Sequence, residues 1–148
     1  MFYGSYALFS ASTYADSLLR LIAAVSGAGL SALGYEARVS GVIVTGQEFA
    51  FRVVRGCDGL EPVGFLWAAV FATPATLPKK CQFAAFGGAV LLLLNLLRVV
   101  SVALVDVHFP TVAEAVHWNA WPAAIILIVV VLWLCWVRRI RLVGDAIG

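Results

Sequence analysis

Three long apolar stretches constrain this chain more than any other feature of its sequence. They cover residues 60–77, 82–105 and 118–137, and the last of them holds no charged side chain. A helix that crosses a bilayer needs about 20 apolar residues. A weaker stretch over residues 14–34 carries Arg20, whose long side chain can reach the headgroups from near a helix end. The sequence therefore predicts an all-α polytopic membrane protein with about four transmembrane helices.

The composition excludes several other classes of protein. Hydrophobic residues make up 63% of the 148 residues, the mean hydropathy is +0.99, and only 12% of the residues are charged. Soluble domains carry about 25% charged residues, so a soluble enzyme, a disordered chain and a secreted disulfide scaffold are all excluded. The net charge of +2, without a basic face, also excludes nucleic acid as a partner. Residues 1–148 are expected to form a single transmembrane domain.

The segment 36–54 has a different pattern from the apolar stretches around it. Phe49, Phe51 and Val53 recur at every second position, and Thr45-Gly46 is typical of a turn. We expect a short β-hairpin outside the bilayer, between the first and second spans. An irregular loop is the alternative.

The distribution of lysine and arginine predicts the orientation of the chain. Lys79 and Lys80 lie in the tight connection between the second and third spans, and three arginines follow the fourth span at positions 138, 139 and 141. Because cytoplasmic loops are enriched in these residues, both termini are expected in the cytoplasm of a plasma (inner) membrane protein. The arginines of the segment 38–55 argue weakly for the reverse orientation.

Cys57 is the best candidate nucleophile in the sequence. It precedes an Asp58-x-x-Glu61 pattern typical of a capping box, and the positive end of the helix that this pattern opens favours a thiolate. Gly56 and Gly59 on either side leave room for a peptide to approach. The alternative is a small buried residue at a helix start. The other two cysteines, at positions 81 and 135, fall in the cytoplasmic half and are expected to be inert.

Arg98 is the second candidate, because a charged side chain within a membrane span indicates a function. Asn95 and Ser101 lie three residues away on either side, which places a polar strip along one helix face. An arginine stays protonated, so it can bind a carboxylate or stabilise an oxyanion but cannot act as a base. The alternative is a structural salt bridge with Glu61 or Asp106.

His117 is the candidate general acid and base, and it is expected at the same outer face of the membrane as Cys57 and Arg98. His108 is a competitor in the same loop, and Glu114 between them is placed to orient either ring. An interfacial histidine without catalytic function is the alternative. A metal site is less favoured, because no closely spaced ligand pair is present. No cofactor is expected.

These motifs resemble those of the exosortase/archaeosortase family of membrane-embedded cysteine transpeptidases. The residues that carry the resemblance are Gly56-Cys57-Asp58-Gly59-Leu60-Glu61, then Asn95-Leu96-Leu97-Arg98, then His117 followed by Trp121. They match the family's Cys-x-Gly motif, its Asn-x-x-Arg motif and its later histidine, in that order. The sequence around the cysteine and the short length of the chain most resemble the exosortase H-type branch.

The resemblance implies a reaction and its partners. Cys57 would attack a backbone carbonyl in a PEP-CTERM-like C-terminal sorting signal of a secreted protein, and an envelope nucleophile would then accept the protein. Arg98 would stabilise the oxyanion, His117 would carry protons, and Asn95, Glu61 and Gly59 would support them. The remaining partners would be membrane lipids and the apolar helix of the signal. This places the active site at the extracytoplasmic face.

Two other functions stay open on the residues alone. One is a non-catalytic membrane scaffold that keeps the fold, although the retention of Cys57, Arg98 and His117 disfavours it. The other is a thiol-dependent membrane acyltransferase that uses a lipid donor. A scaffold would tolerate the loss of Cys57, and an acyltransferase would be labelled by the lipid donor.

Overall fold

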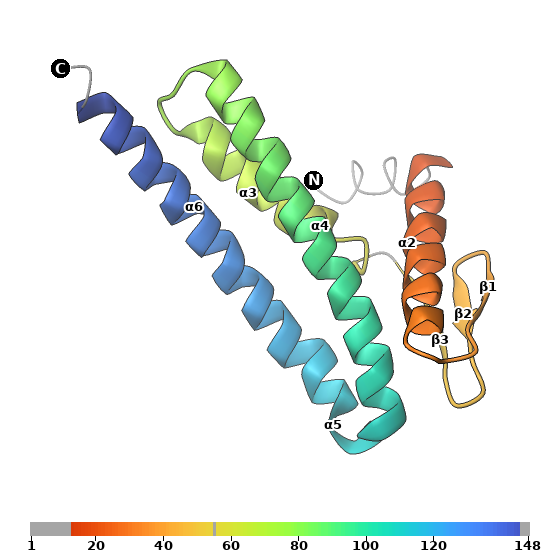
Figure 1. Cartoon of the computed structure of the whole chain (residues 1–148). Coiled ribbons are helices and arrows are strands. Elements are labelled where there is room, and N and C mark those ends of the chain that lie inside the picture. The colour runs from red at the N-terminus through yellow and green to blue at the C-terminus, as the bar shows by residue number, and fades with distance from the viewer. Residues whose placement is uncertain (1–12, 55, 146–148) are drawn as a thin grey trace, which may run out of the picture.

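The protein is mostly helical and carries one small sheet (Figure 1). The computed structural model describes residues 13–54 and 56–145. The helices are α2 (Thr13–Ala32), α3 (Leu60–Ala72), α4 (Leu77–His108), α5 (Pro110–Ala115), the π-helix η1 (Val116–Ala120) and α6 (Trp121–Asp145). The strands are β1 (Arg38–Ser40), β2 (Ile43–Thr45) and β3 (Ala50–Arg52).

Two long apolar helices form the frame of the molecule. The helix Leu77–His108 and the continuous helical stretch Pro110–Ile140 are long and apolar enough to cross a membrane, at 32 and 31 residues. They lie side by side in Figure 1. In the most apolar 18-residue segment of each helix, only 22% and 11% of the segment is buried inside the protein. Most of the apolar surface of these helices therefore faces outward. Large apolar surface on the outside of a helix pair is what a lipid environment allows.

The other two expected spans differ from these. The stretch 60–77 was expected to be one span, but α3 ends at Ala72 because Thr73 adopts an extended backbone and Pro74 follows it. Its 13 residues reach about 20 Å, less than the roughly 30 Å of a hydrocarbon core. α2 closely matches the stretch 14–34, yet it is not among the helices apolar enough to span. The count of four spans therefore stays a prediction.

The segment 36–54 forms three strands rather than the two of the expected hairpin. The order is β1-β2-β3 and both pairings are antiparallel. The turn at Thr45-Gly46 is confirmed, since the Gly46 N–H donates to the Phe49 carbonyl at 2.8 Å. The extra turn lies at Gly41, whose φ of 64° gives the positive angle that a two-residue connection needs at its first position.

The buried side chains form two separate clusters. One joins α2, the sheet and the C-terminal half of α4, and includes Leu30, Val44 and Ala103. The other joins α3, the N-terminal half of α4 and α6, and includes Leu66 and Trp136. The chain that leads from β3 to α3 connects the two clusters, and this chain carries Cys57.

Close helix contact fixes where α3 begins and ends along α4. A Cβ at Gly87 would clash with the Leu66 side chain, so any larger residue there would force Leu66 to shift. The Trp67 Nε1–H donates to the Ala84 carbonyl at 2.9 Å, and the Trp136 Nε1–H donates to the Thr73 hydroxyl at 2.7 Å. α3 therefore starts beside the middle of α4 (Figure 1), where Gly59 approaches Asn95.

Candidate active site

One cavity brings together the three residues that the sequence singled out for chemistry. It encloses ≈ 410 Å³ between β3, α4 and the segment that contains α5 and η1. Cys57, Arg98 and His117 all line it, and each of the three side chains is half-buried. They come from the loop before α3, from α4 and from η1, so residues far apart in the sequence share this cavity.

The loop that carries Cys57 depends on its two glycines. Gly56 and Gly59 have φ angles of 89° and 73°, which residues with a side chain rarely adopt. The Cys57 N–H donates to the Val54 carbonyl at 3.0 Å and closes a tight turn. Gly59 also packs against α4, because a Cβ there would lie 2.9 Å from the Asn95 Cβ. The glycines therefore hold Cys57 against the middle of α4.

Asn95 holds the same loop from α4. Its side-chain Nδ2–H donates to the Cys57 carbonyl oxygen at 2.6 Å, and only 1% of the residue is exposed. Its Oδ1 has no hydrogen-bond partner among the described residues. A buried amide that donates to one backbone carbonyl fixes the position of that carbonyl. Asn95 was a candidate to orient Arg98, but the hydrogen bond that the structure gives it goes to the Cys57 backbone.

The start of α3 differs from the expected capping box. The N-cap is Gly59, which has no side chain to offer, and the Asp58 carboxylate accepts instead from the Leu60 N–H at 3.2 Å. Cys57 therefore lies three residues before the helix, one residue further from its first amide than the pattern indicated. Glu61 lies in the first turn, is exposed, and faces a second cavity rather than the first.

Arg98 lies in the cavity and forms no ion pair with any carboxylate of residues 13–54 and 56–145. Within the described residues no ion pair joins its guanidinium to Glu61 or Asp106, the two partners considered from the sequence. Ser101 does not extend the polar strip into the cavity, since its hydroxyl donates to the Arg98 backbone carbonyl at 3.0 Å. The guanidinium therefore keeps its donors for a ligand.

His117 reaches the cavity from a π-helical turn. The Trp121 N–H bonds to the Val116 carbonyl five residues earlier, and this wider turn holds the imidazole edge-on to the Trp118 ring at 4.9 Å. Short π turns occur often at functional sites. His108 lies elsewhere: its ring contacts the Leu104 carbonyl and the Tyr35 hydroxyl, and it does not line the cavity.

The cavity also holds charged residues to which sequence reasoning gave other roles or none. Asp106 and Glu114 line it together with the two cations Arg52 and Arg98. No hydrogen bond joins Glu114 to His117 in the described part of the chain, so the expected orienting contact is absent there. The spacing of Arg98, Val102 and Asp106 was the available signal, because residues four apart share one helix face.

A second cavity of ≈ 370 Å³ adjoins the first. Arg98 and Trp118 line both cavities, so the two meet at these side chains. The second cavity runs between α3 and α6 and has an apolar wall that includes Phe65, Ile126 and Val130. The cavity that holds the thiol, the guanidinium and the imidazole therefore opens beside an apolar groove.

The arrangement can support attack by a thiol on a carbonyl compound. It supplies a nucleophile, a cation for a developing oxyanion and a group that can accept and return a proton. Among the described residues no group of three histidine, cysteine or carboxylate side chains is placed to hold a metal ion.

The fold and this cavity define a mostly helical membrane protein in which a thiol, a guanidinium and an imidazole share one site. The profile of the family described as transmembrane exosortase, EpsH type, matches residues 1–137. The chain therefore belongs to the transmembrane exosortase family, which confirms the resemblance drawn from the motifs. No significant match to a curated protein or to a solved structure was found.

Proposed function

We propose that this protein is a membrane-embedded cysteine protease and transpeptidase. It cleaves a PEP-CTERM-like C-terminal sorting signal from secreted proteins and transfers them to an envelope acceptor. Members of the exosortase family are generally transmembrane cysteine proteases or transpeptidases. The observation that carries the proposal is the single cavity lined by Cys57, Arg98 and His117.

The first half of the reaction forms a thioester on Cys57. His117 takes the thiol proton, and the thiolate attacks the carbonyl carbon of the scissile peptide bond. The carbonyl electrons move onto oxygen, where the Arg98 guanidinium stabilises the negative charge. The intermediate then collapses, the leaving amine takes the proton back from His117, and the signal departs.

The second half releases the protein to its acceptor. An amine or water at the outer face attacks the thioester and gives a proton to His117, and Cys57 leaves as a thiolate. With an amine the product is a new amide bond, and with water it is a free carboxylate. The acceptor is therefore the group that decides between transfer and hydrolysis.

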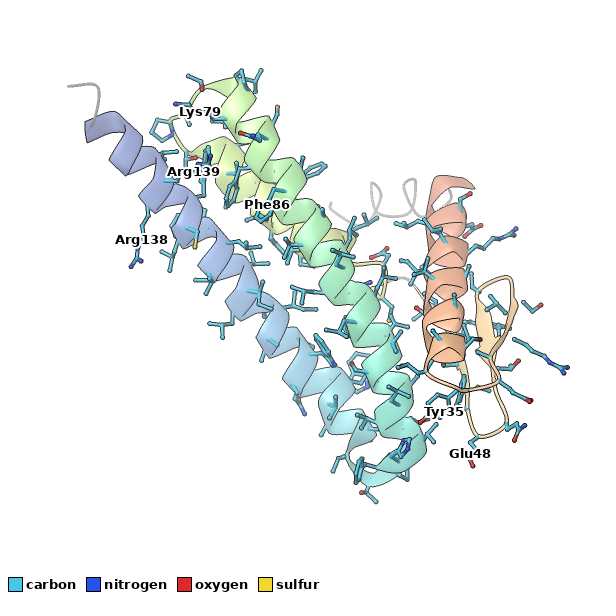
Figure 2. All side chains as sticks on the ribbon, in the orientation of Figure 1. Tyr35, Glu48, Lys79, Phe86, Arg138 and Arg139 are labelled. Atoms are coloured by element: carbon cyan, nitrogen blue, oxygen red, sulfur yellow. The ribbon has the colours of Figure 1, made fainter. Side chains whose placement is uncertain are left out.

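The apolar groove beside the cavity gives the signal's helix a place to lie. Phe65 is 72% exposed and Ile126 is 65% exposed, which suits contact with an apolar helix or with lipid. A helix in this groove would deliver the peptide that precedes it to the junction at Arg98 and Trp118. Lys79, Arg138 and Arg139 lie at the other end of the long helices from α5 and η1 (Figure 2), and this basic end favours the cytoplasmic side.

Mass spectrometry of a co-expressed substrate tests the chemistry. Cys57→Ala is expected to leave the substrate uncleaved, because alanine offers no nucleophile, and Cys57→Ser is expected to be nearly inactive. Cys81→Ala and Cys135→Ala are the matched controls and should cleave normally, since both residues are exposed and outside the cavity. Correct cleavage by Cys57→Ala would refute the covalent mechanism and favour a scaffold.

Photo-crosslinking tests the groove. A photoreactive residue at Ile126 is expected to cross-link to the signal's helix, whereas one at Leu93 should capture only lipid. Leu93 is a fair control because it is 66% exposed on α4 but lines none of the described cavities. Capture of an acyl donor in place of the peptide would favour the acyltransferase.

A further inference from the structure

A third cavity lies near the start of α4 and the C-terminal part of α6, away from Cys57. It encloses ≈ 480 Å³ between the α3–α4 connection and the C-terminal part of α6. Its walls include the cations Lys79 and Arg139 and the polar side chain of Gln82. Figure 2 shows Lys79 and Arg139 close to one another at this end, while Arg138 projects away.

The charge in this cavity is of one sign. None of the described residues that line it is acidic, and no ion pair joins Lys79 or Arg139 to a carboxylate in the part of the chain that the structure describes. Two cations that converge without a counter-ion attract an anion, and a guanidinium beside an ammonium suits a phosphate group.

The remaining walls of the cavity are aromatic. Phe83 and Trp136 are buried, with ring centroids 5.0 Å apart and ring planes tilted by 35°, and they form its apolar side. Phe86 also lines the cavity and is 60% exposed on the outer surface of α4 (Figure 2). The site therefore has a cationic part at the helix ends and an apolar part that continues onto the surface that faces hydrocarbon.

We infer that this cavity binds the headgroup of an anionic glycerophospholipid. The phosphate lies between Lys79 and Arg139, and an acyl chain lies along Phe86. Phosphatidylglycerol is the lipid class that fits, because basic pockets between transmembrane helices select anionic headgroups. A free phosphate ion carries the same negative charge but has no apolar part that could contact the aromatic wall. The inference does not depend on the chemistry proposed for Cys57, because the two sites share no lining residue.

The test uses the full-length protein in nanodiscs of phosphatidylcholine, with phosphatidylglycerol of the same acyl chains titrated in. Thermal melting and native mass spectrometry report binding. Arg139→Glu is expected to abolish the stabilisation by phosphatidylglycerol and to retain fewer lipids. Arg138→Glu is the matched control, because it makes the same charge change at the next residue, outside the cavity.

Each other outcome bears on the inference. Equal losses in Arg138→Glu and Arg139→Glu would show general attraction to the membrane surface and would overturn the site. Equal stabilisation by inorganic phosphate or glycerol 3-phosphate would show a site for soluble anions and would overturn the lipid assignment. If Arg139→Glu inserts poorly, Lys79→Gln and Lys79→Arg replace it: the first should weaken binding at least several-fold and the second should keep it. Unchanged binding in Lys79→Gln would also overturn the inference.

Discussion

The side-chain amide of Asn95 donates a 2.6 Å hydrogen bond to the backbone carbonyl of Cys57. The residues lie 38 positions apart, and this bond ties the loop of the candidate nucleophile to the middle of α4. The bond acts on the backbone rather than on the sulfur. Asn95 therefore fixes the backbone from which the Cys57 side chain projects.

Asn95→Leu tests this positioning role. The substitution keeps a similar volume but removes the donor, so the Cys57 carbonyl loses its partner and the loop can shift. We expect kcat for signal cleavage to fall by about 10- to 100-fold while KM changes little, because small displacements of a reacting group are costly. Steady-state kinetics with a purified substrate give the two constants.

Two measurements separate this outcome from a folding defect. The variant should still insert, and its Cys57 should still react with a small alkylating reagent in detergent. An unchanged kcat would mean that the hydrogen bond does not position the nucleophile.

Gly59→Ala should damage the site through two separate effects. A Cβ at Gly59 meets the Asn95 Cβ at 2.9 Å, and the φ of 73° is unfavourable for any side chain. Gly56→Ala introduces only the second effect, because nothing lies within 4 Å of its Cβ. We expect Gly56→Ala to cost about 1–2 kcal/mol of stability and Gly59→Ala to cost more and to abolish cleavage.

Gly64→Ala is the control for both glycine variants. It lies inside α3 with open space around it, so the change should be neutral or slightly stabilising. Thermal melting and substrate cleavage measured on all three variants check whether the damage increases from Gly64→Ala to Gly56→Ala to Gly59→Ala. Equal behaviour of Gly56→Ala and Gly59→Ala would show that contact with Asn95 is unimportant.

Arg98→Lys tests the geometry of the cation. Lysine keeps the charge but loses the planar fork of donors that a guanidinium presents. Because removal of one oxyanion donor costs about 10²- to 10³-fold in rate, we expect severe loss of processing with near-normal abundance and insertion. Arg138→Lys, outside the cavity, should process normally. Full activity in Arg98→Lys would rule out a geometry-specific contact with the oxyanion.

The proposed orientation is tested by thiol accessibility in intact cells. In a background without other cysteines, Ser40→Cys on the exposed strand β1 should react with an impermeant reagent. Cys81, kept alone, should react only after permeabilisation, and a reporter fused after Gly148 should report the cytoplasm. Labelling of Cys81 alone in intact cells would reverse the orientation and move the site to the other face.

The sequence predicted the long helices well because their apolar runs are long and hold few charged residues. It overextended the stretch 60–77, because hydropathy does not register the break that Thr73 and Pro74 impose on the backbone. It predicted a hairpin at Thr45-Gly46 but missed β1, whose three residues are all exposed and show no alternation. β1 forms through its pairing with β2, so its own residues need not alternate between apolar and polar.

The residues of the candidate site could be proposed from the sequence, but their arrangement in space could not. Topology alone placed Cys57, Arg98 and His117 at one face, and they do line one cavity. Neither the π turn beneath His117 nor the bond from Asn95 to the Cys57 backbone follows from residue type, because both depend on how α3, α4 and α6 pack.

The π turn at Val116–Ala120 has a consequence for how this chain tolerates change in its length. A π turn holds an extra residue, so it is equivalent to a one-residue insertion into a regular helix. Deletion of one residue there would restore regular α-helix and keep α6 nearly in register with α5, because the turn absorbs the extra residue without rotating the helices on either side. A one-residue deletion in the first turn of α6 has no such turn to absorb it and would rotate the rest of α6 by about 100°. The wall formed by Ile125 and Ile126 would then turn away from its groove. The chain is therefore expected to tolerate a change of length at the π turn better than at the start of α6.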